Sequence, residues 1–154
     1  MVKISEIGLW IATIHNLSDR LMESKLKAHN LEDFNATQGR VLFYLQQMDN
    51  TTLAQKSIQD LIDELKIPNS SFTELIDSLV QKDLVERVPS TSDRRKIHIQ
   101  KKESSFNKFL SVYKEILVEM TAAYYRDLSQ EEQKWIERVL PKIIQNLMNE
   151  EKKT

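Results

Sequence analysis

The chain has 154 residues, a formal net charge of −1 and no cysteine, which excludes disulfides, thiolate metal ligands and thiol redox chemistry. Its 40% hydrophobic and 29% charged residues are typical of a soluble globular protein, and no apolar run reaches membrane-spanning length, so we expect a cytoplasmic protein. It contains only two glycines and three prolines, which favours long helices over a loop-rich β-sandwich.

Apolar residues recur at helical spacing near the start of the chain. Isoleucines within residues 4–14 follow a 3-4-3 spacing, which predicts a long amphipathic helix over roughly residues 3–28. Asn35 or Thr37 can cap a second helix, which includes residues 41–45.

Two short helices are predicted in the centre of the chain. After an expected loop at residues 48–52, the apolar spacing predicts one helix over residues 58–65 and another that includes residues 72–80. Pro68 cannot continue the first helix and fits the opening of the second. Two short helices joined by such a turn form a helix-turn-helix unit.

A basic hairpin follows within residues 85–99. Two β-type runs flank a polar turn that carries the consecutive cations Arg94, Arg95 and Lys96. Residues 82–102 hold seven cations and three anions, a net of +4, and such a local patch can steer a polyanion. A basic hairpin directly after a helix-turn-helix predicts a wing whose cations reach phosphates or a narrow minor groove of DNA.

Two further helices are predicted in the last third of the chain. Residues 106–124 have helical spacing, and Ser129 with Glu132 forms a capping box for a final helix, with a kink expected at Pro141. Because the outer helices are apolar on one face, they must pack against something. A symmetric dimer is the simplest arrangement, and a monomeric bundle is the alternative.

The predicted fold is therefore mainly α with a small β-hairpin wing, a winged helix-turn-helix lobe plus long N- and C-terminal dimerisation helices. We expect three domains: an N-terminal dimerisation helix at residues 1–34, a winged helix-turn-helix DNA-binding domain at residues 35–101, and C-terminal dimerisation helices at residues 102–154.

On this order of motifs the chain resembles the MarR family of transcriptional regulators, including its SarA-type branch. The Asp-x-Arg wing tip is the most specific shared element. The matching stretches are Asn35-Ala36-Thr37-Gln38, Ile58–Leu65, Ser70–Thr73 with Leu79, Leu84–Arg87 and Asp93-Arg94-Arg95. The resemblance implies a homodimeric regulator that binds a pseudopalindromic operator in double-stranded DNA and is released by a small-molecule effector.

The resemblance also implies roles for individual residues. The second helix of the motif, the recognition helix, enters the major groove, Arg95 enters the flanking minor groove, and Asp93 orients the wing. Hydroxyls at a helix N-terminus suit phosphates and base edges. The candidate DNA-binding residues are Asn69, Ser70, Ser71, Thr73, Arg87, Asp93, Arg94, Arg95 and Lys96.

An effector pocket for a small aromatic ligand is implied between the DNA-binding lobe and the dimer helices. Its candidate lining residues are Trp10, His15, Tyr44, Phe109 and Tyr113. The alternative is that these are ordinary core residues at helical spacing.

Catalytic and metal chemistry find little support in the sequence. No nucleophile elbow, phosphate-binding glycine loop or dinucleotide fingerprint is present in the sequence, so we expect that the protein is not an enzyme. The histidines lie on three separate predicted elements, with His98 expected to face outward on the wing, so we expect no metal or other cofactor.

The helix-turn-helix itself is acidic. Residues 56–82 hold three cations and five anions, a net of −2. We therefore expect DNA binding to depend on the wing and to weaken strongly with salt. The same acidity leaves open a second function, a winged-helix protein-interaction module with weak DNA binding.

Overall fold

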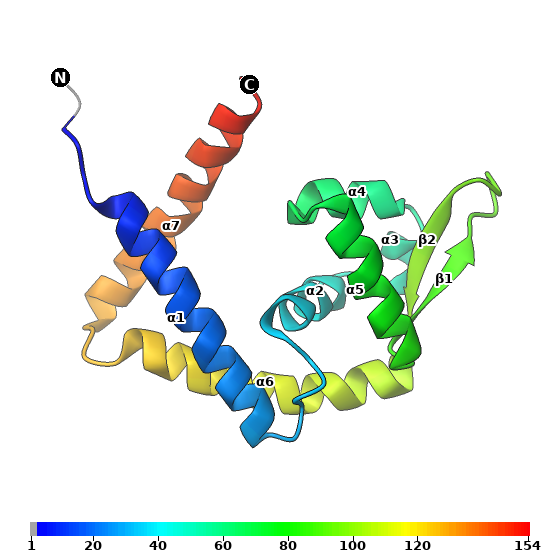
Figure 1. Cartoon of the computed structure of the whole chain (residues 1–154), viewed down its shortest axis with the longest axis horizontal. Coiled ribbons are helices and arrows are strands. Elements are labelled where there is room, and N and C mark those ends of the chain that lie inside the picture. Colours follow the sequence, from blue (N-terminus) through cyan, green and yellow to red (C-terminus); the bar gives the residue numbers. More distant parts are fainter. Residues whose placement is uncertain (1–2) are drawn as a thin grey trace. The chain divides into compact units, whose positions relative to one another are not determined.

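Helices dominate the computed structural model, which describes residues 3–154 (Figure 1). In chain order the elements are α1 (Ile7–Ala28), α2 (Ala36–Gln46), α3 (Asn50–Leu53), α4 (Ile58–Leu65), α5 (Asn69–Gln81), β1 (Val85–Pro89), β2 (Ile97–Lys101), α6 (Glu103–Tyr125) and α7 (Gln130–Glu151). Strands β1 and β2 pair as an antiparallel hairpin. The prediction of a mainly α fold with a β-hairpin wing is confirmed. No helix within residues 3–154 is long and apolar enough to cross a membrane.

Reciprocal side-chain caps set where two of the longer helices begin. The Asn35 side chain accepts the Gln38 N–H, and the Gln38 side chain accepts the Asn35 N–H, so α2 begins after Asn35. The predicted capping box of Ser129 and Glu132 opens α7 in the same way. Helix α7 then continues past Pro141, which lies inside it.

The predicted loop at residues 48–52 is wrong in part, because the short helix α3 lies there. The Asp49 side chain accepts the Thr52 N–H at 2.8 Å and caps this single turn. Four residues are too few to show an apolar period, so this helix has no periodic signal in the sequence.

The chain divides into two compact units, one up to Leu117 and one from Val118 to Thr154. The first unit contains α1 to α5, the hairpin and most of α6, and the second contains the end of α6 together with α7. The domain boundaries expected after residues 34 and 101 stay a prediction.

The core of the first unit is formed by side chains from α1 to α6 and the hairpin. Its large, fully buried residues include Leu26, Leu42, Leu61, Phe72, Ile99, Phe106, Tyr113 and Ile116. Gly39 lets α2 approach α6 closely, since a Cβ atom there would lie 2.7 Å from Tyr113 Oη and 2.8 Å from Tyr113 Cε2. Tyr113 is only 1% exposed, so its ring has little room to move away.

Large apolar side chains are uncovered in each unit. In the first unit most of them lie along α1, and these are Ile7, Leu9, Trp10, Ile11, Ile14 and Leu17. In the second unit most of them lie along α7, and these are Trp135, Leu140, Ile144 and Leu147. Within the second unit, Tyr125 Oη donates to Glu137 Oε1 at 2.7 Å, and this hydrogen bond raises the pKa of the Tyr125 phenol.

Candidate nucleic-acid interface

Helices α4 and α5 form the predicted helix-turn-helix. Helix α4 ends where Lys66 adopts the left-handed conformation, with φ of 58°, and Pro68 precedes the first residue of α5. On its inner face, α5 buries Phe72, Leu75, Ile76 and Leu79. The predicted contact residues Asn69, Ser70, Ser71 and Thr73 all lie in the first turn or so of α5 with exposed side chains.

The first turn of α5 presents hydrogen-bonding groups to solvent. The first backbone N–H groups of a helix have no partner within the helix, and this end carries partial positive charge. Thr73 Oγ1 donates to the Asn69 carbonyl oxygen at 3.0 Å, so its hydroxyl is oriented and keeps its lone pairs for an incoming donor. Ser70 and Ser71 can donate or accept, which suits phosphates and base edges.

Strands β1 and β2 and the turn between them form the wing. Val85 pairs with Lys101, and Pro89 pairs with Ile97 at the outer end of the ladder. The Ser90 N–H donates to the Lys96 carbonyl oxygen at 2.9 Å and closes the turn. The wing therefore has a defined base and a short, closed tip.

Asp93 contacts the backbone and the side chain of a residue at the wing tip. Its Oδ1 atom accepts the backbone N–H of Arg95 at 3.0 Å and also lies 3.4 Å from Arg95 Nε. The Arg95 side chain is nevertheless 92% exposed, and Arg94 and Lys96 are exposed as well. Asp93 thus fixes the backbone of the tip and leaves the guanidinium of Arg95 accessible.

Arg87 lies at the base of the wing and makes an internal contact. Its Nη2 atom donates to Asp77 Oδ1 on α5 at 2.6 Å, so an ion pair joins β1 to the recognition helix. Arg87 was predicted from the sequence as a DNA-binding residue, and its partner Asp77 was not predicted. The pair therefore ties the wing to the helix that carries several other candidates.

Strand β2 is anchored to α3 through Asn50. The Lys101 N–H donates to Asn50 Oδ1 at 2.9 Å, and Asn50 Nδ2 donates to the Lys101 carbonyl oxygen at 3.2 Å. The Lys101 side chain is 8% exposed, donates to the Met48 carbonyl oxygen and lies over the Phe106 ring. This buried lysine therefore supports the wing from inside and is not part of its exposed charge.

Several acidic residues of the helix-turn-helix are occupied by contacts within the protein. Glu64 pairs with Lys56, and Asp77 pairs with Arg87. Asp60 Oδ2 accepts the Ser57 N–H at 2.9 Å, and hydrogen bonds from Ser57 lower the pKa of the Asp60 carboxyl, helped by nearby Lys56 and Lys96. The nominal charge of −2 therefore overstates how much free negative charge this segment presents.

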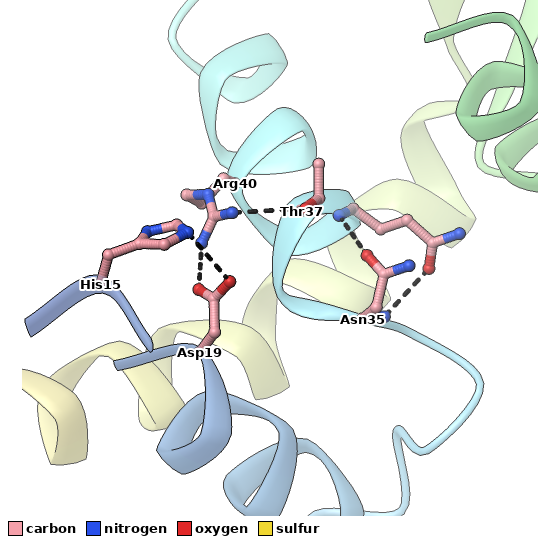
Figure 2. Close-up of polar contacts among 6 residues, drawn as sticks. His15, Asp19, Asn35, Thr37 and Arg40 are labelled. Atoms are coloured by element: carbon pink, nitrogen blue, oxygen red, sulfur yellow. Dashed lines mark hydrogen bonds and ion pairs between the residues drawn. The ribbon is translucent and has the colours of Figure 1, made fainter. Parts of the chain in front are cut away.

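A chain of polar contacts links α1 to α2 near the candidate effector residue His15 (Figure 2). His15 Nε2 lies 3.5 Å from Asp19 Oδ2, and Arg40 Nη1 donates to Asp19 Oδ1 at 2.8 Å. Arg40 Nη2 also donates to Thr37 Oγ1 at 3.3 Å. Since the His15 side chain is 61% exposed, it lies at the surface of the first unit.

The other candidate effector residues lie in different surroundings. Phe109 and Tyr113 are buried and stacked with ring centroids 5.3 Å apart, and Phe34 packs on Phe109 at 4.5 Å. Trp10 is 54% exposed on α1, and Tyr44 donates its hydroxyl to Glu64. The effector pocket stays a prediction.

No group of three or more metal-binding side chains comes together within residues 3–154. His15, His29 and His98 lie on α1, directly after α1, and on β2. His98 is partly exposed on the face of β2 opposite the buried Ile99, and its Nδ1 atom is buried.

Comparison with known proteins identifies the same architecture. Residues 32–96 match the sequence profile of the MarR family. No curated protein sequence matches the chain. Wild-type MarR from E. coli in its apo form shares 21% identity with a TM-score of 0.72, over 92% of this chain and 98% of that one.

Two further solved structures are similar over most of their length. The S. aureus MepR–DNA complex shares 22% identity with a TM-score of 0.76, over 94% of this chain and 99% of that one. A MarR transcriptional regulator from Methanosarcina mazei Go1 shares 20% identity with a TM-score of 0.79, over 93% of this chain and 96% of that one. At this identity the likenesses show a common fold.

Proposed function

The winged-helix segment of this chain, residues 32–96, belongs to the MarR family, and from this we propose that the chain is a transcriptional regulator that binds double-stranded DNA. The MepR structure, which shares the fold, is a complex with DNA. The observation that carries the proposal is that α5, whose first turn is exposed, is joined by the Arg87–Asp77 ion pair to a wing whose cationic tip is exposed.

In the proposed complex, the two surfaces read different grooves. The first turn of α5 enters the major groove, where its hydroxyls and amide meet base edges and phosphates. Arg95 reaches the flanking minor groove, with its backbone held by Asp93. Arg87 acts through Asp77, holding the wing against α5, and contributes its charge to the surrounding field.

We propose that the active form is a homodimer on a pseudopalindromic operator. The uncovered apolar residues of α1 and of α7 support this, because exposed apolar faces on long helices mark interaction surfaces. A two-fold dimer presents two recognition helices and therefore favours an operator with two matching half-sites.

We also propose that binding of a small aromatic ligand releases the protein from DNA. The exposed Trp10 and His15 on α1 support this, because they lie on the helix that the polar contacts link to α2. A ligand bound there should change Trp10 fluorescence on titration and lower DNA affinity in the same concentration range. A fluorescence change with unaltered DNA affinity would contradict its role as an effector.

The test of DNA binding begins with selection of an operator from a random duplex pool. Fluorescence anisotropy on the selected duplex then compares the wild type with Arg95→Ala and with Arg138→Ala, an exposed arginine of α7 that serves as the charge control. We expect Arg95→Ala to weaken binding about tenfold or more and to lower the slope of log affinity against log salt by about one, whereas Arg138→Ala changes little. Equal affinity of wild type and Arg95→Ala would contradict the proposed role of the wing.

A second candidate function is a protein-interaction module with weak DNA binding. The exposed Glu74 in the first turn and a half of α5 favours it, since a carboxylate there opposes phosphate. Failure of the random pool to yield any duplex bound more tightly than micromolar would support this alternative.

A further inference from the structure

A cleft of about 330 Å³ lies between the wing and the segment that leads from α3 into α4. Its lining comes from three separate stretches of chain, and its polar residues include Lys56, Ser57, Asp60, Ser90, Lys96 and His98. The volume is at the small end of the range for ligand sites, so it suits one small molecule. None of the residues predicted for the effector pocket is among those that line it.

His98 lines this cleft, and its ring carries a buried polar atom. Its Nδ1 atom is inaccessible to solvent and has no hydrogen-bond partner among the described residues of the chain. A buried polar atom without a partner costs about 1–3 kcal/mol, and in native structures such atoms call for a bound water, ion or ligand. His98 is held in place by its pairing with Val88 in the wing ladder.

The charges around the cleft favour an anion. Lys56 and Lys96 both line it, and both lower the pKa of Asp60 through their charge. Asp60 also lines the cleft, but its Oδ2 atom is already engaged by the Ser57 N–H at 2.9 Å. Lys56 forms an ion pair with Glu64, so of the two lysines in the lining Lys96 is the more available to a ligand.

Hydroxyl groups add further donors. Ser90 Oγ and Ser92 Oγ lie 3.0 Å apart, so one donates to the other and one hydroxyl hydrogen remains. Ser57 Oγ accepts the Asp60 N–H at 3.1 Å, which uses a lone pair and not its hydrogen. The lining therefore offers ammonium and hydroxyl donors, which suit a ligand rich in acceptor oxygens.

We propose that this cleft binds a small free oxyanion, a phosphate or carboxylate group, held by Lys96, by His98 through Nδ1–H and by the serine hydroxyls. The bound anion bridges the wing and the start of α4. It also neutralises Lys96. The site is distinct from the proposed contacts of Arg95 and α5 with DNA.

The test uses the full chain without DNA and inorganic phosphate as the probe. Isothermal titration calorimetry, with ionic strength held constant by sodium chloride, compares the wild type with His98→Leu, His98→Asn and Lys96→Gln. Asn places a polar atom close to the position of Nδ1, so His98→Asn serves as the rescue variant. Lys142→Gln, at an exposed lysine of α7, is the matched control for a lost charge.

We expect saturable phosphate binding that weakens about tenfold in His98→Leu and in Lys96→Gln, that stays within a few-fold of wild type in His98→Asn, and that is unchanged in Lys142→Gln. Thermal melts of each variant check that it is folded, and His98→Asn with Lys96→Gln keeps the test decisive if His98→Leu unfolds.

Two results would overturn the proposal. One is the absence of saturable phosphate binding, or wild-type binding by His98→Leu. The other is a wild type that binds no free phosphate together with a His98→Leu variant that binds DNA more weakly. That combination would mean that the cleft binds a phosphodiester group of DNA. Because the titration contains no DNA, its failure leaves the proposed regulator function standing.

Discussion

Asp77→Asn tests whether the ion pair between Arg87 and Asp77 positions the wing. The substitution keeps the size of the side chain and removes a negative charge from the recognition helix. Electrostatics alone predicts tighter DNA binding, because a carboxylate is lost near phosphates. Loss of the ion pair predicts weaker binding, because the wing is no longer tied to α5. The two explanations therefore predict opposite signs.

The magnitudes can be worked out from the structure. Arg87 Nη2 and Asp77 Oδ1 are 2.6 Å apart, with side chains 32% and 59% exposed, so the pair belongs with partly exposed ion pairs worth about 1 kcal/mol at most. A unit charge roughly 10 Å from a phosphate contributes about 0.4 kcal/mol in water before salt screening. The lost ion pair therefore outweighs the removed repulsion by about 0.6 kcal/mol, so we expect DNA binding to weaken about threefold.

Anisotropy titrations on the selected operator measure this change, and a double-mutant cycle with Arg87→Met isolates the pair. We expect urea unfolding of the wild type, the two single variants and the double variant to give a coupling energy of about 0.5–1 kcal/mol. Tighter DNA binding by Asp77→Asn, together with additive unfolding energies, would refute the reasoning and would make Arg87 a direct phosphate contact.

Three further predictions follow from packing, assembly and titration. Gly39→Ala should lower the free energy of unfolding by about 1–3 kcal/mol, because the new Cβ atom meets the Tyr113 ring. Gly8→Ala should not lower it, because a Cβ atom at Gly8 meets nothing within 4 Å. Equal urea midpoints for the two variants would contradict the close contact at Gly39. Ile11→Lys on the exposed face of α1 should shift the sedimenting species from dimer to monomer at micromolar concentration, whereas Ser24→Lys on the same helix should not. A wild-type protein that sediments as a monomer would contradict the proposed dimer. The pKa of Asp60 is lowered by folding from its ordinary value of 3.8, so its stabilisation is complete above that value and is lost as pH falls through the lower folded value. The urea midpoint of the wild type should therefore exceed that of Asp60→Asn at neutral pH and approach it in acid, and a constant difference would be the contrary result.

Local signals in the sequence predicted most of the fold. Periodic apolar residues and the capping box of Ser129 and Glu132 depend on neighbours within one or two turns, so they can be recognised without the structure. Helix α3 could not be predicted, because a single turn capped by Asp49 has no apolar period. Asn50 was missed for a related reason, since its partner Lys101 lies 51 residues away on a different element.

The candidate site was less predictable than the fold because its geometry depends on contacts between elements. The period-two pattern of β2 correctly separates the buried Ile99 from the other face, and it therefore predicts His98 to face outward. In the structure the segment before α4 lies near that face, and the wing turn completes a cleft around His98. A strand pattern identifies the face of a side chain, but what covers the second face follows only from tertiary contacts.

The structure also changes how the acidic charge of the helix-turn-helix should be understood. A count of residues treats every carboxylate as free, whereas Glu64 and Asp77 are paired and Asp60 accepts the Ser57 N–H in the capping box of α4. Glu74 remains exposed in the second turn of α5, where a carboxylate opposes phosphate. We therefore expect the exposed cations of the wing to supply a correspondingly larger share of the attraction to DNA.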